Sequence, residues 1–262
     1  MRGGKGHGRP EEAVTPRPTG WRRDDVPDPA QRLDRAFRHA REFALYAPHE
    51  LKTPLTVMRA DIETVRDDTS RSEACGECAA RRLDEIQRLA GIVDALTLLT
   101  KADVGLVTIE QELVLLPELI CECFQDTQVL AEAQDVSVSL GECDTVMVTG
   151  DRHRLRQLLL NLADNAVKYN KPGGTVTFSL RIVGESAEIV VSNTGLGIPP
   201  KLLGHVFDRF VRGQEARERD VDGCGLGLSI CQWIVEAHGG SIGIDSEPDG
   251  LTIATVRLPA HV

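Results

Sequence analysis

The sequence predicts an α+β protein in which an antiparallel helical hairpin is followed by a layered α/β domain. Two observations support this fold class. Between Leu33 and Lys101 apolar residues recur every three or four positions, the repeat of long amphipathic helices. After residue 104 short alternating strands and shorter helices follow one another, which favours helices packed over one mixed sheet.

Composition narrows the class of protein. The 262 residues are 41% hydrophobic and 27% charged, as in soluble proteins, and are enough to bury a core. The net charge of −10 argues against a nucleic-acid binder. No apolar run approaches the roughly 20 residues that cross a bilayer, and residues 1–15 lack the apolar stretch of a signal peptide. We therefore expect a cytoplasmic protein with no membrane span.

The first element expected is a long helix. Residues 1–30 carry Gly, Pro and Arg without periodicity and are expected to be disordered. A helix should then run to about Ser72, and a turn at 73–78, with Gly76, should lead into a second helix ending near Lys101. Two helices rarely bury enough surface alone, so residues 31–103 are expected to form a four-helix bundle in a homodimer.

His49 interrupts the first helix in a distinctive way. It lies two residues from both Ala47 and Leu51, about 200° around the helix, and so points away from the apolar seam. Most helical histidines so placed are plain surface residues. Here Glu50 follows directly and Thr53 lies one turn on, in a stretch where the apolar repeat stutters.

The seven cysteines give a weaker signal. Only Cys75 and Cys78 have the spacing of metal ligands. A zinc site needs about four ligands, and no second such pair is present. Small residues at a turn are the favoured interpretation over metal or redox use.

Residues 104–262 should form the second domain. A strand at 112–116 leads to a helix opened by Pro117 and ending near Ala133. Asp151 is a suitable N-cap for a helix over 152–169. The remaining elements expected are strands at 136–140, 146–148, 175–183, 186–192, 241–246 and 251–258, a short helix at 200–208 and a helix at 226–238.

Helix 152–169 should have two faces. Leucines and Ala166 form one side and should pack on the sheet. Asn161, Asn165 and Lys168 form a narrow stripe roughly 110° away. Amide oxygens suit Mg²⁺ and an ammonium suits phosphate, so this stripe is a candidate nucleotide contact.

Three glycine clusters point the same way. They occupy residues 193–199, 223–228 and 238–240. Glycine lets a backbone approach a ligand closely, and N–H groups before a helix bind phosphate. The second cluster does not follow a strand, which disfavours a dinucleotide fingerprint, and no Gly-Lys-Ser/Thr phosphate loop is present.

Five motifs, taken in order, resemble those of sensor histidine kinases of two-component systems. They match the H, N, G1, F and G2 boxes of that family and together cover about residues 33–258. The resemblance implies a dimerising phosphoacceptor hairpin over 31–103 and a Bergerat-type ATP-binding domain over 104–262. The motifs are His49-Glu-Leu-Lys-Thr-Pro54, Asn161-Leu-Ala-Asp-Asn-Ala-Val-Lys-Tyr169, Asn193-Thr-Gly-Leu-Gly-Ile-Pro199, Val206-Phe-Asp-Arg-Phe210 and Gly223-Cys-Gly-Leu-Gly-Leu228.

The resemblance also implies residue roles. His49 would accept the γ-phosphoryl group of ATP, and Glu50 would orient its imidazole. Glu50 and Thr53 match positions used to dephosphorylate a partner regulator. Arg209 and Arg212 would neutralise the transferring group, Asn165 would ligate Mg²⁺, and residues 213–224 would form a lid. The nucleotide site would comprise Asn161, Asn165, Lys168, Tyr169, Asn193, Gly195, Gly197, Ile198, Gly223, Gly225, Leu226, Gly227 and Leu228.

The implied activity is phosphorylation of His49 and transfer to an aspartate on the receiver domain of a response regulator. The sequence departs from the family at Asn193, where Asp is usual, and at Pro48, where a small polar residue is usual. No sensor module precedes Leu33, so the signal should arrive through a separate sensor protein or through residues 1–30 and a partner.

Two alternatives remain open. Asn193 and Pro48 suggest a kinase-deficient regulator phosphatase or a dimeric signalling scaffold. An ATPase related to chaperones or topoisomerases would share the nucleotide-binding fold, but it would have no use for the exposed histidine of the hairpin.

Overall fold

The computed structural model describes Pro54, Val57, residues 72–213 and residues 223–261. Three predicted parts lie wholly or mostly outside these residues: the N-terminal segment 1–30, the first helix and the lid. His49, Glu50 and Thr53 belong to that first helix and are therefore not described. Pro54 and Val57 are helical. No helix in the described part of the chain is long and apolar enough to span a membrane.

Helix α2 (Ser72–Asp103) corrects one prediction. Residues 73–78 are helical, so the turn expected there is wrong. Alanine and glutamate favour helix throughout this segment, and one glycine costs only about 1 kcal/mol against them. Towards its end α2 buries Ile92, Leu96 and Leu99, while Ile86 and Val93 remain half exposed.

Beyond α2 the chain forms the predicted mixed sheet. Among the residues that the structure describes, the sheet has seven strands in the order β1-β3-β7-β5-β4-β2, with β6 paired to β7. Only β2 and β4 run parallel; the other pairs are antiparallel. The strands are β1 (Glu112–Leu115), β2 (Val136–Cys143), β3 (Met147–Gly150), β4 (Gly174–Val183), β5 (Ser186–Thr194), β6 (Ser241–Ser246) and β7 (Leu251–His261).

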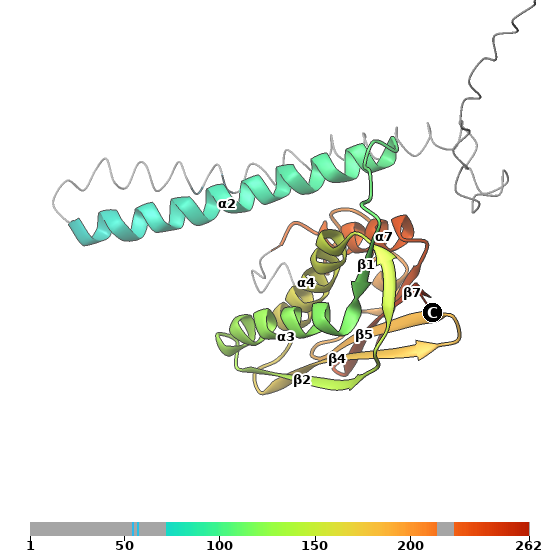
Figure 1. The fold of residues 1–262 in the computed structure, drawn as a ribbon. Coiled ribbons are helices and arrows are strands. Elements are labelled where there is room, and N and C mark those ends of the chain that lie inside the picture. Colours follow the sequence, from blue (N-terminus) through green and yellow to red (C-terminus); the bar gives the residue numbers. More distant parts are fainter. Residues whose placement is uncertain (1–53, 55–56, 58–71, 214–222, 262) are drawn as a thin grey trace, which may run out of the picture.

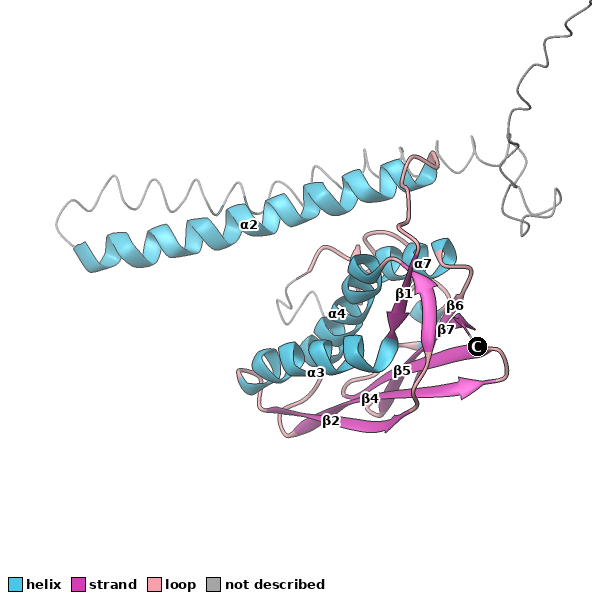
Figure 2. Cartoon of the chain, in the orientation of Figure 1, coloured by secondary structure: helices cyan, strands magenta, loops and turns pink. Residues whose placement is uncertain are grey.

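Three helices cover one face of the sheet, and α2 lies beyond them (Figure 1). They are α3 (Leu116–Glu132), α4 (Arg152–Lys168) and α7 (Gly227–Ala237). Along β4 and β5 buried and half-buried residues alternate, as expected when one face packs on helices. The resulting two-layer arrangement, visible in Figure 2, confirms the predicted fold class.

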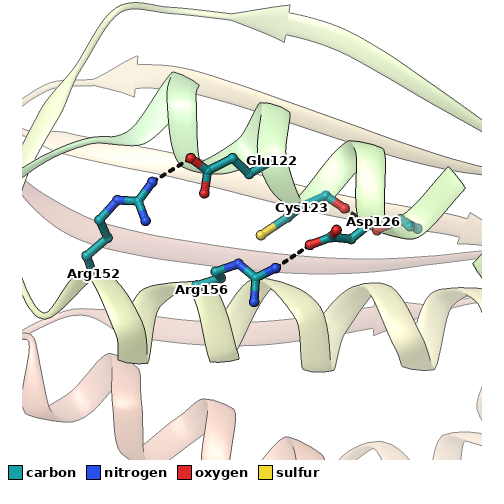
Figure 3. A network of polar contacts seen from close by, with 6 residues as sticks. Glu122, Cys123, Asp126, Arg152 and Arg156 are labelled. Carbon is teal, nitrogen blue, oxygen red and sulfur yellow. Dashed lines mark hydrogen bonds and ion pairs between the residues drawn. The ribbon is translucent and has the colours of Figure 1, made fainter. Parts of the chain in front are cut away.

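Ion pairs tie α3 to α4 across their outer surface (Figure 3). Arg152 pairs with Glu122 at 2.6 Å, and Arg156 pairs with Asp126. Cys123 lies beneath them, and its burial raises the pKa of its thiol to about 12. Cys123 is therefore a neutral core residue between the helices.

Two further local features frame the candidate site. Helix α5 (Pro200–Leu203) is shorter than the predicted helix over 200–208, because Gly204 ends it and residues 204–210 form turns. At the end of α7, His238 accepts a hydrogen bond at Nε2 from the Asp151 backbone N–H and donates one from Nδ1–H to the Ile234 carbonyl. His238 thereby joins α7 to the start of α4.

Candidate functional site

A cavity of about 700 Å³ opens between α4, β5, the loop before α5 and the start of α7. Its size is that of a pocket for a nucleotide-sized ligand. Four segments separated in sequence meet there. The predicted site residues that line it are Asn161, Asn165, Lys168, Tyr169, Asn193, Gly197, Ile198, Arg212, Gly223, Gly225, Gly227 and Leu228.

Helix α4 presents its polar stripe to this cavity. The Asp151 side chain caps the helix by accepting from the Arg154 N–H at 3.0 Å. The leucine face is buried against the sheet, as its periodicity predicted. That packing turns Asn161 and Asn165 towards the cavity.

The polar groups of the stripe differ in their partners. Lys168 Nζ pairs with Asp164 Oδ2 at 2.6 Å, and Asn161 Nδ2 lies 3.5 Å from the Gly227 carbonyl. The side-chain amide of Asn165 makes no hydrogen bond with any residue that the structure describes. Its oxygen is therefore available to a ligand in the cavity.

Asn193 lines the cavity from the end of β5. Its side chain is 7% exposed, and its Nδ2 donates to the Thr194 carbonyl at 2.8 Å. The Thr194 hydroxyl donates to Asn170 Oδ1, and the Asn170 amide bonds the Ala166 carbonyl. This network uses one of the two Nδ2 N–H donors of Asn193, and no described residue donates a hydrogen bond to its Oδ1, which can therefore accept one from a ligand.

Two glycines of the 193–199 cluster are required by close backbone approach. At Gly197, φ is +71° and an added Cβ would lie 2.0 Å from the Glu247 carbonyl oxygen. At Gly195 an added Cβ would lie 2.3 Å from the Tyr169 carbonyl oxygen. Gly195 does not line the cavity, so it serves packing between the cluster and the end of α4.

The 223–228 cluster forms the opposite wall and leads into α7. Gly223, Gly225 and Gly227 line the cavity, whereas Leu226 is buried in the core with 1% exposure. Cys231 follows on α7, donates to the Leu158 carbonyl at 3.7 Å and is fully enclosed. Burial raises the pKa of the Cys231 thiol to about 12, so it is neutral and structural.

The two predicted arginines separate in the structure. Arg212 lines the cavity. Arg209 does not: its Nη2 pairs with Asp103 Oδ1, at the end of α2, at 2.8 Å. The sequence pattern placed both on one segment, but the turn after α5 sends them in different directions.

Several lining residues were not predicted. Asp164 pairs with Lys168 in the stripe, and Asn170 anchors the Asn193 network. Asn170 follows the helix end directly, and this polar extension of the stripe was the available signal. Apolar walls come from Val191, Leu196, Leu202, Val206, Ile244 and Ala254, which sequence alone could not assign to one cavity.

Metal binding was also predicted at this site. Among the residues that the structure describes, no three His, Cys, Asp or Glu side chains gather as a metal cluster. Mg²⁺ usually takes only one or two protein oxygens, with water and substrate phosphates supplying the rest. The unpartnered Asn165 amide oxygen fits that mode.

Comparison with known proteins defines the class. Residues 39–105 match the family model of the His Kinase A (phospho-acceptor) domain. Residues 150–262 match the model of the histidine kinase-, DNA gyrase B- and HSP90-like ATPases. The chain therefore combines a phosphoacceptor module with an ATPase-type module.

Individual relatives specify the family. The chain is 37% identical over 236 residues to the sensor histidine kinase TrcS of Mycobacterium tuberculosis, covering 88% of this chain and 45% of TrcS. It is 32% identical to the solved mycobacterial sensor histidine kinase MprB, with a TM-score of 0.52, covering 57% of this chain and 99% of that one. The chain belongs to the sensor histidine kinases of two-component systems. It spans less than half the length of TrcS and of two other curated sensor kinases that it matches, SrrB of Staphylococcus aureus and TcrY of Mycobacterium tuberculosis.

One solved structure matches over more of the fold. Histidine kinase ThkA, in complex with the response regulator protein TrrA, has a TM-score of 0.71 and covers 88% of this chain and 65% of that chain. At 23% identity this likeness shows the fold alone.

Proposed function

We propose that this protein is a Mg²⁺- and ATP-dependent protein-histidine kinase that phosphorylates His49 and passes the phosphoryl group to an aspartate of a response regulator. One observation carries the proposal. The cavity collects the Asn161–Tyr169 stripe and the glycine clusters at 193–199 and 223–228, but not the one at 238–240, around one nucleotide-sized space, on a chain whose phosphoacceptor module contains His49.

We assign adenine recognition to the part of the cavity that Asn193 lines. Asn193 Oδ1 is the proposed acceptor for the adenine amino group, because an amino group donates and an amide oxygen accepts. The apolar side chains of Leu196 and Ile198 line the same cavity and could contact the base. Asparagine keeps the acceptor of the aspartate usual in the family, so Asn193 supports ATP binding.

The phosphates are assigned to the opposite end. Asn165 would hold Mg²⁺, which would offset the negative charge of the phosphates. Asn161, Lys168 and Tyr169 contact the nucleotide from α4, and the Gly223–Leu228 backbone faces it from the start of α7. Arg212 lines the same cavity and is the candidate to neutralise the transferring group.

The reaction at His49 is a phosphoryl transfer. An imidazole nitrogen lone pair attacks the γ-phosphorus, a P–N bond forms, and the P–O bond to ADP breaks with its electrons leaving on ADP. Glu50 accepts a hydrogen bond from the other ring nitrogen and favours the nucleophilic tautomer. These two residues lie outside the described structure, so their roles rest on the motif.

The remaining partners follow from the helical module. Ile86 and Val93 are 52% and 51% exposed on α2, and a homodimeric four-helix bundle would bury them. ThkA is solved with a response regulator, and this supports a receiver domain as the phosphate acceptor. Glu50 and Thr53 are the residues proposed to assist regulator dephosphorylation. We place the activity in the cytoplasm, where ATP is available.

Nucleotide titration with and without Mg²⁺ tests the metal assignment. We expect Asn165→Ala to lose the Mg²⁺-dependent part of ATP affinity. Gln157→Ala removes an amide from the same helix outside the cavity and should bind as the wild type does. Unchanged Mg²⁺ dependence in Asn165→Ala would show that another group holds the metal.

Turnover separates the kinase from its alternatives. Transfer from the phosphorylated protein to one member of a response-regulator panel supports the kinase. Steady ATP hydrolysis by His49→Ala would favour an ATPase instead. Absence of transfer together with regulator dephosphorylation would favour a kinase-deficient phosphatase.

A further inference from the structure

We propose that the ion pair between Asp103 and Arg209 is the contact through which the end of α2 positions the 223–228 glycine cluster of the nucleotide cavity. The proposal rests on the proposed function, since it takes ATP as the occupant. Arg209 is thereby a positioning residue that acts through its neighbours, and not a group that touches the phosphates.

The pair itself is unusually shielded. Arg209 Nη2 lies 2.8 Å from Asp103 Oδ1, and the two side chains are only 12% and 19% exposed. The Arg152–Glu122 pair, by contrast, leaves both side chains more than 40% exposed. Shielded pairs are screened little by solvent, so their loss is felt more strongly than that of surface pairs.

The ion pair joins the end of α2 to the segment that follows α5. Asp103 is the last residue of α2, and Arg209 lies 106 positions later, after α5. Leu96 and Leu99 of α2 are buried and belong to the same apolar cluster as the core of the domain. Apolar contacts tolerate sliding, whereas a hydrogen-bonded ion pair fixes one relative position.

Backbone contacts of the next residue, Phe210, connect Arg209 to the cavity wall. Phe210 follows at φ +63°, is 7% exposed, and donates its N–H to the Gly225 carbonyl at 2.8 Å. An added Cβ at Gly225 would lie 2.8–2.9 Å from backbone atoms of Phe210. The two backbones are thus in direct contact, so a displacement of residues 209–211 displaces Gly225.

Gly225 belongs to the wall that would face the nucleotide. Gly223, Gly225 and Gly227 line the cavity, and α7 begins at Gly227. The backbone before a helix N-terminus binds phosphate through N–H groups whose direction matters. The position of the end of α2 therefore determines the direction in which these backbone N–H groups point.

The coupling must act in both directions. Displacement or unwinding of the last turn of α2 should weaken ATP binding by releasing residues 209–211. Conversely, bound ATP should stabilise that last turn. A signal that alters α2 would then change nucleotide affinity without touching the cavity.

Titration of the full chain with a fluorescent ATP analogue tests this inference. We expect Asp103→Asn and Arg209→Gln each to raise the Kd by about five- to tenfold, within the usual range of coupling between sites. The reversed pair, Asp103→Arg with Arg209→Asp, should recover most of the affinity. Glu122→Gln breaks a surface pair of the same domain and should leave the Kd unchanged.

Amide hydrogen exchange supplies the second readout. In the wild type the analogue should slow exchange in the last turn of α2, and in Asp103→Asn this protection should be lost while the sheet stays protected. Weaker binding in Arg209→Gln with unchanged binding in Asp103→Asn would overturn the inference, because Arg209 would then act on the nucleotide itself. A wild type that binds no ATP would instead refute the proposed function.

Discussion

The Asn193→Ala variant probes the assignment of the adenine end most sharply. In the wild type Asn193 lines the cavity, and its Nδ2 donates to the Thr194 carbonyl. Truncation removes both Nδ2 and Oδ1, leaving the adenine amino group unpaired in an enclosed site. An unpaired buried donor costs about 1–3 kcal/mol, which corresponds to roughly a 5- to 150-fold rise in the Kd for ATP.

The internal control changes the ligand in place of the protein. Purine riboside triphosphate lacks the 6-amino group, so it should bind the wild type about as weakly as ATP binds Asn193→Ala. The variant itself should not distinguish the two nucleotides. Such a cycle isolates the one contact, because losses common to both ligands cancel.

Isothermal titration of both proteins with both nucleotides provides the four values. The free variant should also lose about 1 kcal/mol of unfolding free energy with the bond to Thr194. If Asn193→Ala discriminated between the nucleotides as strongly as the wild type does, the base would not contact Asn193. The orientation assigned to the ligand would then be wrong.

Three further changes test the framework of the site. Gly197→Ala should destabilise the domain by roughly 2–4 kcal/mol in urea unfolding, since φ is +71° and the Cβ meets the Glu247 carbonyl; a smaller loss would mean that the loop shifts freely. Asp151→Ala removes the cap of α4 and should cost about 1 kcal/mol in the same assay; no loss would deny that cap its role. Burial raises the pKa of the Cys231 thiol from 9.0 to about 12. The buried thiol therefore contributes its full stabilisation below pH 9, where it is protonated in both the folded and the unfolded chain. This stabilisation is lost as pH rises towards 12, because the unfolded chain ionises first. The stability of wild type relative to Cys231→Ala should fall by about 1.4 kcal/mol per pH unit there, and a pH-independent difference would contradict the burial.

Much of the fold was predictable because local and tertiary preferences agree. In α4 the cap, the leucine face and the polar stripe are all encoded within the helix, and the structure has all three. The turn expected at 73–78 failed because Gly76 and the scarce apolar residues resembled a connection. Backbone propensity outweighed that pattern, and α2 begins at Ser72.

The site was less predictable where it depends on packing between distant segments. Residue type and spacing pointed to the stripe and to the glycine clusters at 193–199 and 223–228, which line the cavity, but also to the cluster at 238–240, which does not. Arg209 and Arg212 were indistinguishable in sequence, and only the turns after α5 send one to Asp103 and the other to the cavity. The role of Gly195 likewise depends on a carbonyl at the end of α4.

The central claim is that His49 receives the phosphoryl group of ATP. Incubation of the full chain with γ-labelled ATP and Mg²⁺, followed by mapping of the labelled peptide, tests it most directly. We predict acid-labile label on His49, absent from His49→Ala and strongly reduced in Asn165→Ala. Label that persists in His49→Ala, or a wild type that binds ATP yet acquires no label, would contradict the account.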